Sequence, residues 1–274
     1  GALSALQTDV DQIVRRTRPS VVTVLAQRAV QRPGEPEPRT RSRVGSGVAV
    51  EEQRIVTVAS LVLGAQRVVI RTSNGLVAEA IVVGADPVSN LALLQVRTLK
   101  LPPLRYASGE ARIGDWVVSL GTTFRAQPTQ SVGNVAYVHR EPASTLLQLT
   151  NTVYPGNSGA AAINTKGELV GIVEGELGMP DVADGAEGAE RPAGAASFVM
   201  PVEIVKRVVA QLVREGRPRH GFLGVTTRAL SVRSPRKEGK RTPIGALIER
   251  VVPGSPADRA GLVAGDIIVA FRGE

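Results

Sequence analysis

Apolar residues recur along this chain with two different periods, which predict helices at two places and many short strands. Over residues 5–16 the apolar positions Leu6, Val10, Ile13 and Val14 fall on one helical face, and Pro19 ends that helix. Short β-rich runs separated by Gly, Pro, Asn or Asp follow at residues 20–27, 46–50, 55–59, 67–71, 78–83, 91–96, 116–120 and 146–149. Such runs are typical of a closed β-barrel or a sandwich, and not of alternating strands and helices.

A change of pattern near residue 216 divides the chain into two predicted domains. Residues 201–214 read as a second amphipathic helix, and the polar residues 214–220, with Gly and Pro, predict a linker. We therefore expect one domain over residues 1–216 and another over residues 217–274. Two other segments are predicted to be loops, one rich in Pro and Arg and one acidic and rich in Gly: residues 28–43 and 174–196.

Composition narrows the possible chemistry. The chain has 274 residues, of which 43% are hydrophobic and 21% charged, so it can build a folded core. Cysteine is absent, which excludes disulfides, a thiol nucleophile and cysteine-ligated metals. The two histidines, His139 and His220, lie far apart in the sequence, so we expect no multi-histidine metal centre and no cofactor. No apolar run reaches the ~18 residues of a membrane-spanning helix.

The net charge of +8 raises the question of a nucleic-acid partner. The basic residues are mostly arginines spread along the chain, with local clusters at residues 39–43 and 233–241. Aromatic side chains, on which unpaired bases stack, make up only 3% of the residues. We therefore interpret the charge as a solvated basic surface and expect no nucleic-acid partner.

The sharpest chemical signal is the sequence Pro-Gly-Asn-Ser-Gly at residues 155–159. A serine between glycines on a tight turn can present its hydroxyl while nearby N–H groups point into one small space. Ser158 is then a candidate nucleophile, and the N–H groups of Gly156, Asn157 and Ser158 are candidate oxyanion-hole donors. Turns of Gly and Ser are common, so this motif alone is also consistent with an ordinary turn.

Other short motifs surround this turn in a characteristic order. They are Gly-Ser-Gly-Val at 45–48, Ile-Val-Thr at 55–57, Asp-Pro at 86–87, Leu-Ala-Leu-Leu at 91–94 and Leu-Val-Gly-Ile at 169–172. In this order they resemble the HtrA (high-temperature-requirement) family of trypsin-like proteases. The resemblance implies a mostly β fold of two barrels followed by a PDZ domain. It also implies a periplasmic or cell-envelope location, although no signal peptide is visible in this sequence.

The resemblance shows two departures at the catalytic positions. The family carries a histidine within Thr-Asn-Asn-His-Val, where this chain has Ser60, and an aspartate before Leu-Ala-Leu-Leu, where it has Asn90. Of the family's catalytic histidine, aspartate and serine, only the serine is kept here, as Ser158. A serine hydroxyl needs a base to take its proton, and losing that base typically costs roughly a millionfold in turnover. The sequence therefore predicts an HtrA-like pseudoprotease that binds peptide segments or partner proteins without cleaving them.

The C-terminal residues resemble the PDZ module of the same family. The matching segments are Gly221, Phe222, Leu223, Gly224 and Val225, and then residues 252–268. In such a module a peptide adds as a strand to the sheet edge, and loop N–H groups capture its terminal carboxylate. Because the sequence stops at residue 274, before the helix that forms the other wall of the groove, we expect a truncated PDZ domain.

Two alternatives to a non-cleaving binder stay open. One is an active serine endopeptidase with a rearranged base, for which His139 recruited from another chain is the candidate; His220 and Lys166 are weaker candidates. The other is a scaffold whose assembly is the function, since the family resemblance implies trimers built through N-terminal segments. The aromatic residues often used for that contact are absent from residues 1–27, so the homotrimer is an open expectation.

Overall fold

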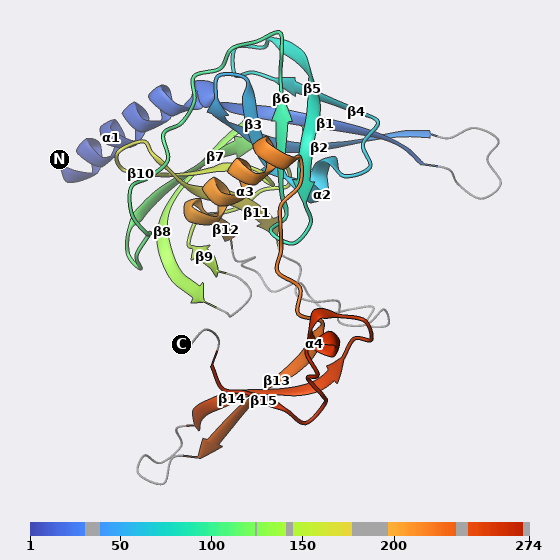
Figure 1. The fold of residues 1–274 in the computed structure, drawn as a ribbon. Coiled ribbons are helices and arrows are strands. Elements are labelled where there is room, and N and C mark those ends of the chain that lie inside the picture. The colour runs from blue at the N-terminus through green and yellow to red at the C-terminus, as the bar shows by residue number, and fades with distance from the viewer. Residues whose placement is uncertain (31–38, 124, 141–144, 177–196, 234–240, 271–274) are drawn as a thin grey trace, which may run out of the picture. The chain divides into compact units, whose positions relative to one another are not determined.

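The computed structural model describes residues 1–30, 39–123, 125–140, 145–176, 197–233 and 241–270. The chain forms two compact units, Gly1–Pro218 and Arg219–Glu274. Strands dominate both units (Figure 1), which confirms the expectation of a mostly β fold with two barrels and a PDZ-like sheet.

The first barrel forms the N-terminal half of the larger unit. Helix α1 (Ala2–Thr17) and a short 3₁₀ turn, η1 (Arg18–Ser20), lead into it. Its strands close in the order β1-β2-β3-β6-β5-β4. Their bounds are β1 Val21–Val30, β2 Arg39–Glu51, β3 Arg54–Val58, β4 Arg67–Arg71, β5 Val77–Asp86 and β6 Leu91–Gln95. Strand β4 shows why the chain folds this way: Val68 and Ile70 alternate inward while Arg67 and Arg71 face water.

The second barrel repeats this plan, closing in the order β10-β11-β12-β9-β8-β7. Its bounds are β7 Trp116–Thr122, β8 Pro128–Arg140, β9 Thr145–Leu149, β10 Ala161–Asn164, β11 Leu169–Glu176 and β12 Ser197–Pro201. One hydrophobic cluster joins the two barrels, since it contains Ile55 and Leu94 from the first and Leu120 and Ile172 from the second. The cleft between the barrels therefore rests on a common core.

Two helices follow the barrel strands. The short helix α2 (Ala59–Val62) comes directly after β3, and α3 (Val202–Glu215) packs its buried valines against β5, β6, β11 and β12. Helix α3 ends at Gly216, whose φ of +69° is the left-handed conformation that favours glycine at this position. Both long helices were predicted from their apolar period, and their ends lie within three residues of the expected ones.

The two predicted loops need correction. Strands β1 and β2 stay paired as far as Val30 and Arg39. The two ends of the Pro- and Arg-rich segment are therefore the arms of a β-hairpin and not a loop. Strand β11 likewise runs through Glu176, inside the predicted acidic loop. The remaining residues of these loops, 31–38 and 177–196, lie outside the described chain.

The smaller unit is an antiparallel sheet in the order β13-β14-β15, with bounds Val225–Arg233, Arg241–Val251 and Ile267–Ile268. One short helix, α4 (Pro256–Arg259), begins at Ser255, whose hydroxyl accepts the N–H of Asp258. Strand β13 pairs with β14 on one side and stands at the edge of the sheet among the described strands.

Candidate active-site cleft

The side chain of Asn157 holds the turn that carries Ser158. Its Oδ1 accepts the Tyr154 N–H at 2.8 Å, and its Nδ2 donates to the Thr122 carbonyl at 2.9 Å and the Thr129 hydroxyl at 2.8 Å. The Asn157 N–H itself donates to the Tyr154 carbonyl at 2.9 Å. The buried amide thus ties the turn to strands β7 and β8, and the Asn157 N–H is already engaged.

The other two expected oxyanion donors are free. In the described part of the chain, the N–H groups of Gly156 and Ser158 make no hydrogen bond. The turn is fixed through its carbonyls instead: Ser46 donates its hydroxyl to Gly156 O at 2.9 Å and its N–H to Ser158 O at 2.8 Å. Two unpaired amides beside a half-buried serine are what an oxyanion hole requires, and this role stays a prediction.

Gly159 explains why a glycine follows the serine. Its φ is +88°, and a Cβ at this position would lie 2.1 Å from the carbonyl oxygen of Ser46. Its N–H donates to the Val173 carbonyl at 2.8 Å, which joins the serine turn to strand β11. Only glycine allows the turn to lie this close to β2 while pairing with β11.

Ser60 and Asn90, the two positions where the family carries histidine and aspartate, lie together on the first barrel. Ser60 is exposed on α2, and its N–H donates to Oδ1 of Asn90 at 2.8 Å. Asn90 has a φ of +51°, a conformation that asparagine tolerates better than most residues. Arg43 donates to the Ser60 carbonyl at 3.1 Å, so the Ser60 main chain is anchored on both sides.

Glu174 is the site residue that the sequence did not reveal, because it was assigned to the acidic loop. It lies on β11, and its Oε2 accepts Nδ2 of Asn90 at 3.0 Å. Its Oε1 is buried and has no hydrogen-bond partner. Burial raises the pKa of Glu174 to about 7 from a usual 4.5, and the Asn90 hydrogen bond offsets only part of that rise. A recognisable signal was available: the apolar run at 169–173 continues a strand into Glu174.

The two histidines lie in different units of the chain. His139, on β8, hydrogen bonds Gln148 at 2.9 Å and packs edge-on to Tyr137, with its ring 5.6 Å from that of Phe198. The serine turn contacts β8 at Thr129, and His139 lies near the other end of this strand, about 30 Å further along it. His220 belongs to the smaller unit and is exposed.

The predicted PDZ loop is ordered by its backbone. The carbonyls of Leu223 and Gly224 accept N–H groups from Ala257 and Val252, at 2.9 and 2.7 Å. Gly224 has a φ of +84°, and a Cβ there would lie 2.1 Å from that of Ser255. The side chains of Phe222 and Leu223 are exposed beside the free edge of β13, where an added strand would lie.

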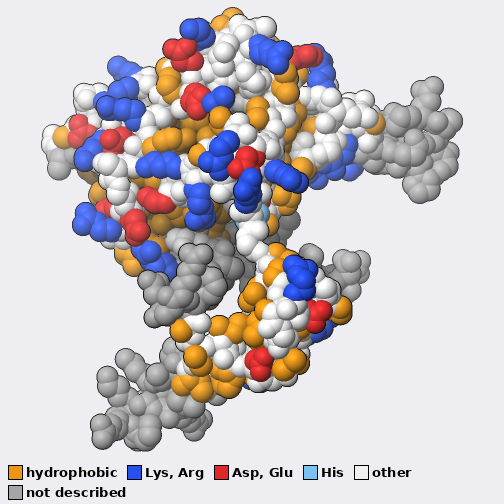
Figure 2. All heavy atoms as spheres, viewed as in Figure 1, with side chains coloured by type: hydrophobic (Ala, Val, Ile, Leu, Met, Phe, Trp, Pro, Cys, Tyr) orange, Lys and Arg blue, Asp and Glu red, His pale blue; other side chains and the backbone are white. Residues whose placement is uncertain are grey.

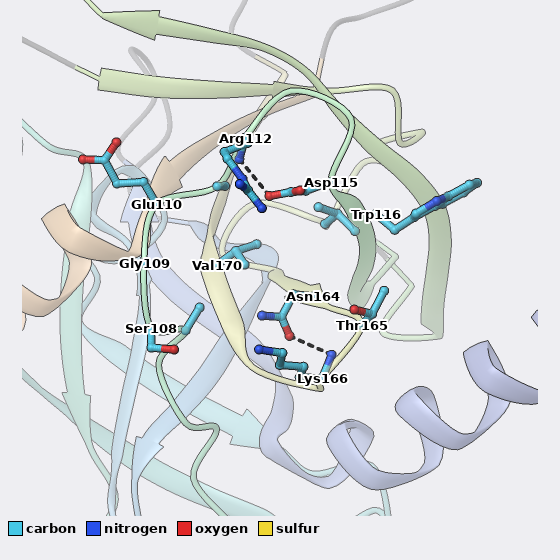
Figure 3. Close-up of a pocket in the computed structure, with 13 residues that line it drawn as sticks. Ser108, Gly109, Glu110, Arg112, Asp115, Trp116, Asn164, Thr165, Lys166 and Val170 are labelled. Atoms are coloured by element: carbon cyan, nitrogen blue, oxygen red, sulfur yellow. Dashed lines mark hydrogen bonds between the residues drawn. The ribbon is translucent and has the colours of Figure 1, made fainter.

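One cavity lies on the second barrel, and its lining does not include Ser158. It holds about 480 Å³ and is lined by residues of the 107–117 segment and of the turn after β10 (Figure 3). Arg112 and Lys166 share its wall with Glu110 and Asp115, and the Arg112 N–H donates to Asp115 at 2.8 Å. The two basic and two acidic side chains of this wall thus balance in charge.

Within the part of the chain that the structure describes, no group of three or more His, Asp or Glu side chains is placed to hold a metal ion. No described helix is long and apolar enough to cross a membrane.

Comparison with known proteins defines the class of the two units. Residues 45–172 match the trypsin-like peptidase domain, and residues 247–274 match the PDZ domain. The crystal structure of a serine endoprotease from Yersinia pestis aligns with a TM-score of 0.71 at 27% identity, covering 96% of this chain and 82% of that one. The structure titled HtrA-type protease AlgW with decapeptide aligns with a TM-score of 0.76 at 23% identity, covering 96% and 86%, and so supports the fold alone.

Named relatives then identify the family. A probable periplasmic serine endoprotease DegP-like of Chlamydia muridarum is 31% identical over 252 residues, which cover 88% of this chain and 48% of the relative. The periplasmic serine endoprotease DegP of Escherichia coli is 31% identical over 240 residues, covering 84% and 48%. The chain belongs to the HtrA family, as its sequence motifs suggested. It spans about half the length of the curated relatives it matches.

Proposed function

We propose that this HtrA-family chain binds peptide or unfolded-protein segments without hydrolysing them. The proposal rests on the residues at the two positions where the family carries its catalytic histidine and aspartate. Ser60 offers no basic group, and the side chain of Asn90 is held at both ends, by the Ser60 N–H and by Glu174. Because the family's histidine position holds Ser60 and the one histidine of the larger unit, His139, lies at the other end of β8 from the serine turn, the Ser158 hydroxyl lacks the base that attack requires.

Two surfaces support a binding role. The serine turn keeps two unpaired N–H groups, from Gly156 and Ser158, which can hold a peptide carbonyl without cleaving it. In the smaller unit, β13 offers a free sheet edge beside the exposed side chains of Phe222 and Leu223. An extended peptide that pairs with this edge would gain main-chain hydrogen bonds, and the two side chains would cover its apolar end.

The relatives suggest where this binding takes place. Several are named periplasmic, and we infer the same compartment or the cell envelope for this chain. We also infer trimers of the HtrA type, because Leu3 and Leu6 of α1 remain exposed on the apolar face of the helix. Sedimentation at working concentration tests this assembly, and a monomer there would remove it.

The function is tested with casein and a fluorophosphonate probe. The wild-type protein and Ser158→Ala are compared for casein cleavage and for covalent labelling, with fluorescence anisotropy of unfolded casein as the binding readout. We expect binding by both proteins and neither cleavage nor labelling by either. Cleavage that disappears in Ser158→Ala would overturn the proposal.

The second candidate, an active endopeptidase, rests on the intact oxyanion donors and on the names of the relatives. It requires a base from another chain, and His139 is the candidate because it is half-buried on a strand of the second barrel. Loss of serine-dependent cleavage in His139→Ala, recovered by mixing His139→Ala with Ser158→Ala protein, would support this candidate.

A further inference from the structure

Among the described residues, one positive charge without an ionic partner lies between the two barrels. Arg18 follows α1, and its guanidinium reaches the second barrel, where it donates to the Gly121 carbonyl at 3.1 Å and the Thr129 carbonyl at 2.8 Å. It has no carboxylate partner among the described residues. Burial lowers the pKa of Arg18, which is the direction expected when no anion compensates the charge.

Arg18 forms part of the wall of a cavity of about 320 Å³. The wall comes from β1, from the end of β4 with the turn after it, and from β7 with the loop that joins it to β8. Of the thirteen lining residues, two are arginines and none is acidic. Hydroxyl and amide groups of Thr72, Ser73 and Gln127 supply further polar atoms around the space. The cavity is therefore positive and polar, and has room for a small ligand.

The second arginine, Arg71, ends β4 and is exposed at the same cavity. Within the described chain its side chain makes no hydrogen bond and no ion pair. Its neighbour on the strand, Arg67, shows the usual alternative, since it pairs with Glu79 at 2.5 Å. The cavity of Figure 3 also differs from the Arg18 cavity in its charge, because its two basic side chains share the wall with two acidic ones.

We propose that this inter-barrel cavity is a binding site for a small oxyanion ligand that carries phosphate or carboxylate groups. The planar guanidinium groups of Arg18 and Arg71 match such oxygens in pairs, and the hydroxyl of Ser73 can donate to a remaining one. A bound anion would compensate the half-buried Arg18 charge, which its two carbonyl partners only solvate. Binding of an anion at this site does not require that Ser158 hydrolyses anything.

The position of the site gives it a route to the serine turn. Arg18 is bonded to the carbonyls of Gly121 and Thr129, while Asn157, which anchors the turn, is bonded to the Thr122 carbonyl and the Thr129 hydroxyl. The two sets of bonds thus share the same short stretch of β7 and β8. An anion that binds Arg18 would therefore compete with the Gly121 and Thr129 carbonyls for its guanidinium. These carbonyls belong to the segment that anchors the candidate oxyanion hole.

The experiment is isothermal titration of the full chain with sodium phosphate and, separately, with sodium succinate, at ionic strength held constant with chloride. Constant ionic strength matters because the chain carries a net charge of +8, and Figure 2 shows Lys and Arg scattered over the visible face. We expect saturable binding at one site for one of the two anions. Phosphate alone indicates a phosphorylated ligand, and succinate alone indicates a carboxylate ligand.

Variants locate the binding. Arg71→Gln changes an exposed side chain that holds no other group, so it will fold, and we expect it to weaken binding by about tenfold or more. The matched control is Arg67→Gln on the same strand, which should leave the affinity unchanged. No saturable binding of either anion up to about 100 times a millimolar dissociation constant would overturn the proposal. An equal loss in both variants would overturn it too, because it would indicate general surface attraction.

Discussion

The buried carboxyl of Glu174 makes the stability of the larger unit depend on pH in a direction that can be tested. The pKa of Glu174 is raised to about 7 in the folded chain, against 4.5 for an ordinary glutamate. The folded state therefore holds this proton more tightly than the unfolded state does. The resulting stability is fully present below about pH 4.5 and is lost as the pH rises through about 7. The loss over this window is roughly 3 kcal/mol.

The perturbation is Glu174→Gln, which removes the titration and keeps an oxygen that can accept from Asn90. Denaturant unfolding is followed by fluorescence of Trp116, the single tryptophan, which reports the larger unit. We expect the variant to gain stability relative to the wild type between pH 5 and pH 8, by most of that roughly 3 kcal/mol. Comparing the two proteins at each pH cancels all titrations that they share.

The control is Glu79→Gln, which removes an exposed carboxylate paired with Arg67. Because water and an arginine already surround that carboxylate, this variant should follow the pH dependence of the wild type to within a few tenths of a kcal/mol. If wild type and Glu174→Gln lose stability in parallel from pH 5 to pH 8, the folded chain does not withdraw the Glu174 carboxyl from water.

Two glycines give further predictions. Gly159→Ala forces a Cβ against the Ser46 carbonyl at a φ of +88°, so the larger unit should lose about 3 kcal/mol or more; a loss below about 1 kcal/mol in tryptophan-monitored unfolding would contradict the tight turn. Gly224→Ala places a Cβ 2.1 Å from that of Ser255, so the Val252 amide, bonded to Gly224 O, should lose hydrogen-exchange protection. Unchanged protection would show that the loop can relax at little cost.

Features that depend on local period and turn chemistry were predictable from the sequence. The helices α1 and α3 follow from the 3.6-residue spacing of their apolar residues, and the left-handed Gly216 stops α3. The serine turn follows from Gly156 and Gly159, whose positive φ values few other residues adopt. In each case the signal lies within a few neighbouring residues, so no knowledge of distant contacts is needed.

Features that depend on contacts across the barrels were not predictable. Glu174 lies in a segment whose acidic and Gly-rich composition predicts a solvated loop, yet its carboxyl is withdrawn from water because β11 contacts β3 of the first barrel and Glu174 meets Asn90. Arg18 likewise looks like a solvated charge after a helix, and only the fold brings it to the carbonyls of Gly121 and Thr129. Sequence spacing carries no information about partners a hundred residues away.

Asn90 and Glu174 form a matched pair, which bears on the proposed absence of cleavage. An aspartate at position 90 would face the Glu174 carboxyl across about 3 Å, and two such carboxyls cannot both be ionised. Asparagine removes this conflict, because its Oδ1 accepts from Ser60 while its Nδ2 donates to Glu174. Restoring a triad by Ser60→His and Asn90→Asp alone would therefore recreate the carboxyl conflict. Under the proposed function, positions 60, 90 and 174 are therefore coupled, and restoring the first two calls for replacing Glu174 as well.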